Sequence, residues 1–531
     1  MSTPFSTLDT ELHCGVTLLE ASAGTGKTYT LAAIYLRLLL EHGLTVREIL
    51  VTTYTIPATA ELRDRIRRRL AECLAAFESG ESDDAFLAGL LTRHDAEQAQ
   101  ERLRDALRDF DEAAIHTIHG FCQRMLREAT FESGTGFDFE LLPDQSAILR
   151  EAAEDFWRQH FASAAPAITA FALLEKLTPD ALLALQRTGS RPGLTLIPPS
   201  KSDTAQAALA SLAVFRAQWP SWREKVRAFL VTETAWAKKP FSDSDYAEPL
   251  LDLVDALASN DDAPLNAYAA LTHFTPEKVQ ASTRAKATAP QHAFFDWCAD
   301  FADACAAFAL AVRHEWLATV PQVLAARKSE RGLLAFDDLL TALRDALAGP
   351  AAASLISACR FRAALVDEFQ DTDATQDEIF HRLFALDAHW LMLIGDPKQA
   401  IYGFRGADIF TYLTARSTAA HRYTLDTNHR SDASLIAAVN ALFARPHQPF
   451  VEPRIAFEAV HAARGEAERP LTHGGVARAP MRFWYWENEK PIGVTEAAST
   501  LPPIVAAEIA RLLQRGTGKM PVPHPLRPPL T

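Results

Sequence analysis

Residues Ala363–Asp373 read AALVDEFQDTD, and residues Trp390–Asp408 read WLMLIGDPKQAIYGFRGAD. Each stretch begins with an apolar run of strand length and passes directly into polar residues: an Asp-Glu pair in the first, and Gly-Asp-x-x-Gln in the second. An acid pair and a glutamine at the ends of two buried strands suit a protein that senses the terminal phosphate of a nucleotide. This interpretation requires a phosphate-binding loop elsewhere in the chain.

Such a loop lies near the amino terminus, between an apolar run and a stretch with helical periodicity. The candidate ATP-binding residues in it are Ala21, Ser22, Ala23, Gly24, Thr25, Gly26, Lys27 and Thr28. Backbone amides of such a loop, with the helix N-terminus, bind polyphosphate oxygens. We expect Lys27 to reach the β- and γ-phosphates and the Thr28 hydroxyl to ligate Mg²⁺. Ala21 replaces the usual first glycine, so the match is imperfect. A chance loop is the alternative, and the flanking strand and helix argue against it.

The acid pair and the glutamine are the candidate catalytic groups. Asp367 is expected to hold Mg²⁺, directly or through water, while Glu368 polarises the attacking water. Gln399 is placed to hydrogen-bond both the γ-phosphate and that water. An exposed acidic loop is the alternative for a bare Asp-Glu, but this pair follows a buried strand in a chain that also has a phosphate loop.

Polar and aromatic residues at further strand ends and helix starts are candidates for contact with the phosphates or bases of a single-stranded nucleic acid. Aromatic rings stack on unpaired bases because every base presents a π-face, and polar tips contact backbone phosphates. The candidate DNA-binding residues are Tyr54, Thr55, Thr117, His119, Tyr402, Phe404 and Arg405. Core packing is an equal alternative for Tyr402 and Phe404, and a core histidine is the better interpretation of His119.

Composition sets outer limits. The 531 residues carry a net charge of −14, so the chain as a whole does not attract nucleic acid, and any binding must come from local grooves. The six cysteines are scattered without a Cys-x-x-Cys pair, which argues against a zinc site or disulfide framework. Without a signal peptide or an apolar run of about 18 residues, we expect a soluble, cytoplasmic protein with no membrane partner.

Strand-like and helix-like stretches alternate over residues 16–130, which is typical of a parallel α/β sheet. From about 135 to 330 helical patterns dominate, with a loop at Leu196–Asp203. We therefore expect a helical domain inserted into the α/β one, since an independent downstream domain leaves the acid-bearing strand without a sheet.

A new unit is expected from His421, with a helix around Asp432–Phe443, a strand at residues 482–488 (RFWYWEN) and a last helix near Ile504–Gln514. Residues 516–531 are rich in proline, which excludes helix and central strand, so they are expected to form a disordered tail. The GTGK within them follows no strand and is not expected to bind nucleotide.

Six stretches occur in one order: ASAGTGKT, TYTIPATAELRDRI, TIHGFCQRML, LVDEFQDTD, LIGDPKQAIYGFRGAD and LDTNHRS. In order and wording they resemble the motifs of the UvrD/Rep-like superfamily 1 DNA helicases. More narrowly, EASAGTGKT, ATAELR, TIHGFCQRML and AFDDLL resemble the RecB branch of that family. The resemblance spans nearly all of residues 16–445 and is weakest in the helical part.

The resemblance implies an α/β fold with a RecA-like P-loop NTPase domain, a large helical insertion and an incomplete second RecA-like domain. Domain 1A is expected at residues 1–130 and 331–420, and domain 1B at 131–330. Residues 421–515 are expected to form part of domain 2A and the start of 2B. The Pro-rich tail at 516–531 lies outside these domains.

The resemblance also implies that ATP lies between domains 1A and 2A. Arg430 of LDTNHRS corresponds to an arginine that reaches the γ-phosphate, and His429 takes the place of an aromatic residue that stacks on adenine. A clear upstream glutamine motif for adenine is missing.

The implied function is ATP hydrolysis coupled to 3′→5′ movement on single-stranded DNA, in double-strand break repair and recombination. ATP and Mg²⁺ are the implied cofactors. Single-stranded and duplex DNA, and RecC-like and RecD-like subunits, are the implied partners. Later helicase motifs and a nuclease domain are not found before Thr531, so a truncated chain is expected. Two alternatives stay open: an ATP- and DNA-binding module without productive unwinding, and a P-loop kinase or unrelated NTPase, against which the motifs of Gln399 and Arg430 speak.

Overall fold

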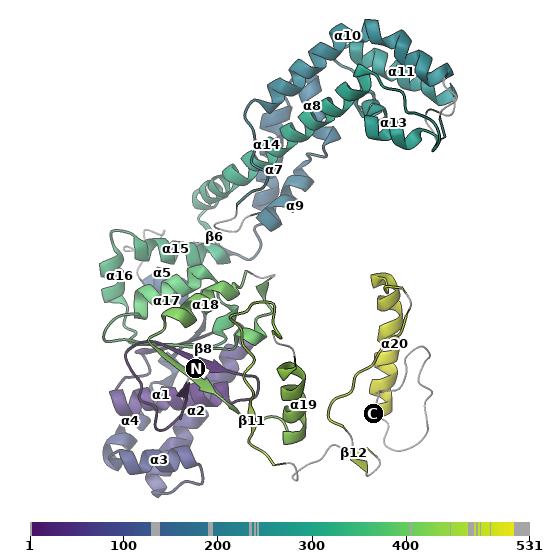
Figure 1. Cartoon of the computed structure of the whole chain (residues 1–531). Helices are drawn as coiled ribbons and strands as arrows, with labels where there is room; N and C mark the ends of the chain where they lie inside the picture. Colours follow the sequence, from purple (N-terminus) through teal and green to yellow (C-terminus); the bar gives the residue numbers. More distant parts are fainter. Residues whose placement is uncertain are drawn as a thin grey trace. The chain divides into compact units, whose positions relative to one another are not determined.

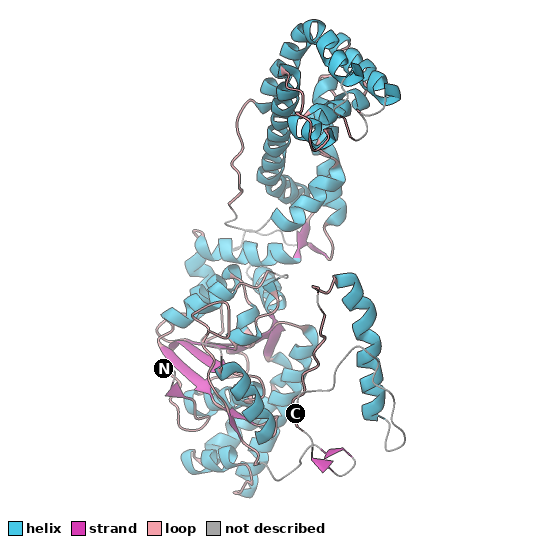
Figure 2. Cartoon of the chain, turned by 45° about the vertical axis from the view of Figure 1, so that its right-hand side comes forward, coloured by secondary structure: helices cyan, strands magenta, loops and turns pink. Residues whose placement is uncertain are grey.

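A seven-stranded sheet organises the part of the chain that carries every motif above (Figures 1 and 2). The order is β1-β9-β2-β8-β7-β3-β4, and every neighbouring pair is parallel. The strands are β1 (Thr3–Pro4), β2 (Gly15–Ala21), β3 (Ile49–Thr53), β4 (Ala114–Thr117), β7 (Ala363–Val366), β8 (Trp390–Gly395) and β9 (His421–Leu425). The expected α/β fold with a parallel sheet is confirmed.

The computed structural model describes residues 3–128, 139–189, 195–232, 236–237, 241, 244–403, 406–445, 448–465, 472–473, 476–477, 479–488 and 490–513. Phe404, Arg405 and the Pro-rich residues 516–531 lie outside the described residues. The chain divides into two units, Met1–Phe137 with Asp337–Thr531, and Asp138–Phe336.

Helices cover both faces of the sheet (Figure 1). One face carries α1 (Lys27–His42), α2 (Ile56–Ser79), α3 (Ala85–Arg93) and α4 (Ala96–Arg108). The other carries α5 (Ile118–Glu128), α15 (Phe336–Ala348), α16 (Ala352–Ala358), α17 (Ala374–Phe384) and α18 (Ile409–Thr418). Alternate strand residues such as Leu19, Val51 and Leu365 pack with α1, α2 and α4 in one core, as the two-residue period of a strand requires. Strands buried on both faces read as continuous apolar runs, which is why the sequence revealed them.

The second unit is helical, with a short parallel pair formed by β5 (Glu140–Leu142) and β6 (Leu333–Ala335). Its helices are α7 (Ser146–Phe161), α8 (Pro166–Leu174), α9 (Pro179–Gly189), α10 (Thr204–Thr232), α11 (Ser244–Ser259), α12 (Leu265–Ala270), α13 (Pro276–Ser282) and α14 (Ala293–Glu330). Aromatic side chains fill their shared core, including Phe215, Phe294 and Trp316. The loop expected at Leu196–Asp203 is present.

After the sheet come β10 (Thr427–Asn428), α19 (Ala433–Ala444), β11 (His461–Ala462), β12 (Thr472–His473), β13 (Val476–Ala477) and α20 (Val494–Leu513). Four short 3₁₀ turns complete the described elements: Phe110–Glu112, Leu271–Phe274, Phe369–Asp371 and Pro397–Gln399.

The carboxyl-terminal boundaries need two corrections. Strand β9 pairs with β2 from Thr17↔His421 to Ala21↔Leu425, so residues 421–425 belong to the first sheet and no new unit begins at His421. Residues 482–488 are described without a strand, and Phe483 and Tyr485 are exposed. A strand needs hydrogen-bonding neighbours, and none of the described segments pairs with this one.

No single one of the described helices is long and apolar enough to cross a bilayer. Helices α15 and α16, which meet at a bend of 110°, reach the necessary length and apolar composition only together.

Candidate functional site

The phosphate loop leaves β2 and ends at the first residue of α1. Gly24 and Gly26 have φ of +82° and +88°, a left-handed conformation that glycine adopts without strain. Thr25 Oγ1 donates to the Ser22 carbonyl at 2.7 Å, which closes the turn inside the loop. Helix α1 begins at Lys27 without a side-chain cap on its first amides, so these donors face outward where an anion binds.

Asn428, at the end of β10, holds this loop from the other side. Its Nδ2 donates to the Ala23 carbonyl at 2.8 Å, and its Oδ1 accepts from the backbone N–H groups of Arg430 and Ser431 at 2.9 Å each. A Cβ on Gly24 would lie 2.7 Å from Asn428 Nδ2, so only glycine permits the approach. The phosphate loop and the segment that carries Arg430 are therefore fixed to each other.

Lys27 and Glu368 form an ion pair across the sheet edge, with Nζ and Oε2 2.6 Å apart. Glu368 has φ of +53°, a left-handed conformation unusual for a non-glycine residue. The same Oε2 accepts from Gln370 Nε2 at 2.8 Å. The structure thus brings together the two residues on which the sequence hypothesis depends.

Two further carboxylates lie beside this pair. Asp367 and Asp371 are buried, and one oxygen of each lacks a hydrogen-bond partner among the described residues. Burial first, and then the charge of Glu368, raise the pKa of each to about 6, while Lys27 opposes the shift. A buried, unpaired carboxylate fits a cation, and Asp367 therefore suits Mg²⁺.

No set of three or more His, Cys, Asp or Glu side chains in the described chain has the geometry of a self-sufficient metal site. Mg²⁺ is usually held by one or two carboxylates together with substrate phosphates and waters.

The end of β8 contributes Gln399. Its Nε2 donates to Asp396 Oδ2 at 2.8 Å, and the other oxygen of Asp396 accepts from Lys398 Nζ, also at 2.8 Å. Arg430 is exposed and lines a cavity of about 460 Å³ with Ser22, Lys398 and Gln399.

A larger cavity, of about 600 Å³, opens on the opposite side of the loop. Phe5, Thr7, Gly26, Tyr29 and His429 are among the residues that line it. His429 and Arg430, adjacent in sequence, thus face different cavities at the two sides of the phosphate loop.

Two arginines hold parts of this larger cavity in place. The Arg37 guanidinium donates to the carbonyls of Thr7 and Thr10, which fixes the amino-terminal segment. Arg69 donates to the Tyr29 hydroxyl at 2.9 Å and lies 4.9 Å from its ring centre. A cavity of this size has room for the base of a nucleotide.

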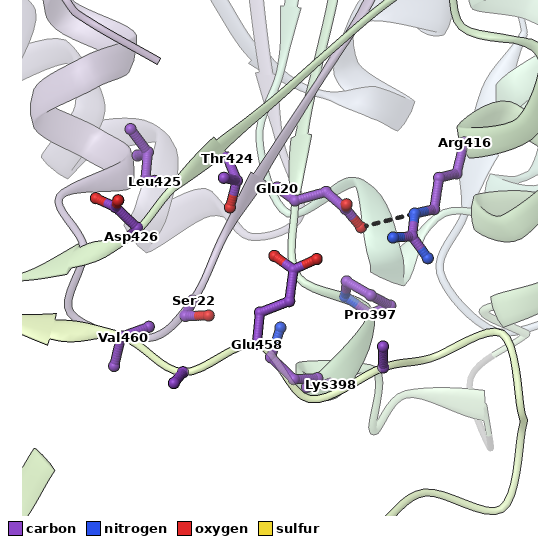
Figure 3. A pocket seen from close by; sticks show the side chains of 12 residues that line it. Glu20, Ser22, Pro397, Lys398, Arg416, Thr424, Leu425, Asp426, Glu458 and Val460 are labelled. Carbon is purple, nitrogen blue, oxygen red and sulfur yellow. Dashed lines mark ion pairs between the residues drawn. The ribbon is translucent and has the colours of Figure 1, made fainter. Parts of the chain in front are cut away.

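Beneath the loop, Glu20 fixes the end of β2. Figure 3 shows its carboxylate directed at Arg416, with Glu458 rising toward it from the segment below. Arg416 Nε lies 3.2 Å from Glu20 Oε1, and Tyr412 donates to the same oxygen at 3.2 Å. The space left among these side chains is about 20 Å³, enough for one water molecule and far too small for a nucleotide.

Comparison with known proteins agrees with this geometry. The model of the UvrD/REP helicase N-terminal domain matches residues 8–420. The chain belongs to the UvrD/REP helicase family. RecBCD enzyme subunit RecB of Escherichia coli is 37% identical over an alignment of 523 positions, which covers 94% of this chain and 44% of that protein.

The RecB subunits of Haemophilus influenzae and Mycobacterium tuberculosis are 34% and 30% identical, over 91% and 94% of this chain. The chain spans 44% of the first of these two proteins and 36% of the second. It therefore spans less than half the length of these curated relatives.

The remaining predicted residues follow the ends of β3, β4 and β8. Tyr54 and Tyr402 come from different strands and stack on each other, with ring centres 5.4 Å apart and planes at 23°. Thr55 is exposed, but its hydroxyl caps α2 by accepting from the Ala58 N–H at 3.2 Å. The sheet edge thus brings together two of the aromatics expected to contact bases.

Thr117 and His119 lie at the junction of β4 and α5. The Thr117 hydroxyl accepts from the Gly120 N–H at 3.1 Å. Burial lowers the pKa of His119, and the charges of Asp337 and Asp373 oppose that shift. His119 is half-buried.

Sequence reasoning missed Gln370, Asn428, Phe5 and Tyr29. The motif wording contained signals for two of them, since Gln370 lies inside DEFQD and Asn428 inside LDTNHRS. Phe5 and Tyr29 carried no such signal, because their shared cavity depends on how the amino-terminal segment crosses α1.

Proposed function

We propose that the chain is the amino-terminal motor portion of an ATP-dependent DNA helicase of RecB type. The observation that carries the proposal is the Lys27–Glu368 ion pair, which joins the phosphate loop to the acid-bearing strand. Family membership supports the same reaction class. The coupling of hydrolysis to 3′→5′ movement on single-stranded DNA is part of the proposal.

Nucleotide binding exchanges the partners of Lys27. The β- and γ-phosphates of ATP take the ammonium group away from Glu368, which then loses a neutralising cation and becomes the stronger base toward a nearby water. Gln399 orients that water against the γ-phosphate, and Arg430 approaches the same phosphate from the Asn428 segment. Asp367 and Thr28 are the residues to hold Mg²⁺, which when bound neutralises phosphate charge.

The larger cavity is proposed as the base pocket. Tyr29 and His429 supply flat surfaces for stacking on adenine, and Phe5 closes the apolar side.

The Tyr54–Tyr402 pair is proposed as the base-stacking part of a single-stranded DNA path, to which Thr55, Thr117 and His119 add contacts. Phe404 and Arg405 lie outside the described residues, so they are included in this proposal from their sequence positions alone. Rings 5.4 Å apart must separate before a base can lie between them, since stacked rings need about 3.4 Å of thickness each.

We further propose that residues 1–130 and 331–425 form domain 1A, 131–330 domain 1B, and 426–515 the start of domain 2A. RecC-like and RecD-like subunits are the proposed protein partners, because the similar proteins are named as subunits of the RecBCD enzyme.

An ATP- and DNA-binding module without unwinding is the second candidate, because the phosphate loop, its ion pair and the larger cavity support nucleotide binding without requiring turnover. ATP hydrolysis and duplex unwinding, measured with and without single-stranded DNA, separate the two. A motor hydrolyses ATP faster with DNA, and Glu368→Gln abolishes hydrolysis while ATP still binds. Hydrolysis that DNA does not raise and that this substitution does not lower contradicts the motor proposal.

A further inference from the structure

Gln370 connects the two strand ends that carry the proposed reaction chemistry. It is 1% exposed and lies in the turn after β7. Its Nε2 donates to Glu368 Oε2 at 2.8 Å, and its Oε1 accepts from the Asp396 N–H, after β8, at 2.9 Å. A backbone N–H can only donate, so Oε1 must face Asp396 and the amide nitrogen must face Glu368.

The room for this side chain comes from a glycine. A Cβ on Gly395 would lie 2.7 Å from Gln370 Oε1 and 3.1 Å from its backbone N. Strand β8 therefore ends in glycine at the one point where Gln370 crosses from the neighbouring strand. The buried amide donates to Glu368 and Asp371 at its own strand end and accepts from Asp396 across the crossing, so both sides of the amide are used.

The connection continues to Gln399. The N–H of Asp396 is held by Gln370, and the carboxylate of the same Asp396 accepts from Gln399 Nε2 at 2.8 Å. Glu368, Gln370, Asp396 and Gln399 thus form one chain of contacts from the proposed base to the proposed phosphate sensor. Every member lies at the carboxyl ends of the adjacent strands β7 and β8.

The ion pair with Lys27 cannot fix Glu368 during the reaction. In the proposed function Lys27 turns to the phosphates of ATP, and Glu368 then keeps Gln370 as its hydrogen-bond donor. A left-handed backbone at a non-glycine residue persists only where surrounding contacts fix it, and the hydrogen bond from Gln370 is one such contact for Glu368.

We propose that Gln370 is a positioning residue that holds Glu368 in place once ATP has drawn Lys27 away, and couples it through Asp396 to Gln399. The inference rests on the proposed ATPase function. It assigns to Gln370 no contact with substrate.

Steady-state ATP hydrolysis of the full chain with saturating oligothymidylate tests the proposal. Gln370→Met keeps the length of the side chain and removes both hydrogen bonds, and Gln370→Glu keeps the acceptor and removes the donor. Gln376→Met is the matched control, because Gln376 is also buried but lies on α17, and its Oε1 has no partner among the described residues.

We expect both Gln370 variants to lower kcat at least tenfold with KM for ATP changed less than threefold, and the control to retain kcat within twofold. A Gln370→Met chain that retains kcat within twofold overturns the inference. So does a loss of kcat accompanied by an equal rise in KM, because that pattern indicates damage to nucleotide binding.

A double-mutant cycle distinguishes failure of the inference from failure of the proposed function. If the wild-type chain hydrolyses no ATP, the proposed function fails, and urea unfolding of Gln370→Met, Glu368→Ala and the double variant still tests the contact. We expect the effect of the double variant on the unfolding equilibrium constant to differ at least fivefold from the product of the two single-variant effects. If the double-variant effect equals that product within twofold, the inference is overturned whether or not the chain is an ATPase.

Discussion

The contact between Asn428 and the phosphate loop supplies the most quantitative prediction. Asn428→Asp keeps the oxygen that accepts from Arg430 and Ser431 but replaces the donor to the Ala23 carbonyl with a second oxygen. The hydrogen bond to Ala23 is lost, and the new carboxylate oxygen faces the Ala23 carbonyl oxygen, so that two acceptors are brought together. A lost bond costs about 1 kcal/mol, and an unsatisfied buried group about 1–3 kcal/mol.

Because Asn428 holds the phosphate loop, we expect ATP binding to weaken by about 2 kcal/mol, which corresponds to roughly a tenfold to thirtyfold rise in the Kd for ATP. The measurement is a fluorescence titration with a labelled ATP analogue and Mg²⁺, accompanied by urea unfolding of each variant. Asn440→Asp is the control, because Asn440 Nδ2 holds the Val460 carbonyl at 2.9 Å by the same chemistry.

The two variants are expected to lose similar stability, and Asn428→Asp alone to lose nucleotide affinity. A Kd for Asn428→Asp within twofold of wild type refutes the reasoning. Equal weakening by both variants also refutes it, because the effect then comes from general destabilisation.

Three further outcomes are expected. Gly24→Ala places a Cβ 2.7 Å from Asn428 Nδ2 in a left-handed conformation, and should abolish ATP binding in the same titration with the fold retained by circular dichroism. Asp367→Asn should stabilise the Mg²⁺-free chain at pH 7.5 by about 2 kcal/mol in urea unfolding, because a pKa raised to about 6 means that the ionised side chain destabilises the fold above that pH; a less stable variant contradicts this. Burial, with the nearby Arg124, lowers the pKa of His116 to about 4. The unfolded chain thus takes up this proton before the folded chain does, so the fold loses stability as the pH falls below 6.5, by about 2 kcal/mol at pH 5, and the loss is complete below pH 4; Gln in its place should flatten that part of the pH–stability curve.

Much of the fold could be predicted because its signals are local. A strand buried on both faces is a continuous apolar run, and the glycines at 24 and 26 mark a loop that needs positive φ. The phosphate loop and the acid pair were found in this way, and the structure brings Lys27 to within 2.6 Å of Glu368.

The rest depends on contacts that no local pattern encodes. Asn428 reaches the phosphate loop across more than 400 residues of sequence, and its role follows from β9 joining the first sheet. Periodicity predicts that a strand such as β9 exists, but its sheet is decided by which neighbours complete its hydrogen bonds. The same reasoning explains residues 482–488, where an apolar pattern is present and no described strand pairs with it.

The central claim is that this chain hydrolyses ATP with the carboxylates that follow β7, and that DNA activates this hydrolysis. The most direct test is the ratio of kcat with saturating oligothymidylate to kcat without DNA, measured for wild type and for Tyr54→Ala/Tyr402→Ala. The account predicts a ratio of at least ten for wild type and a ratio near one for the double variant, with ATP affinity unchanged. A wild-type ratio of one, in a chain that binds ATP, contradicts it.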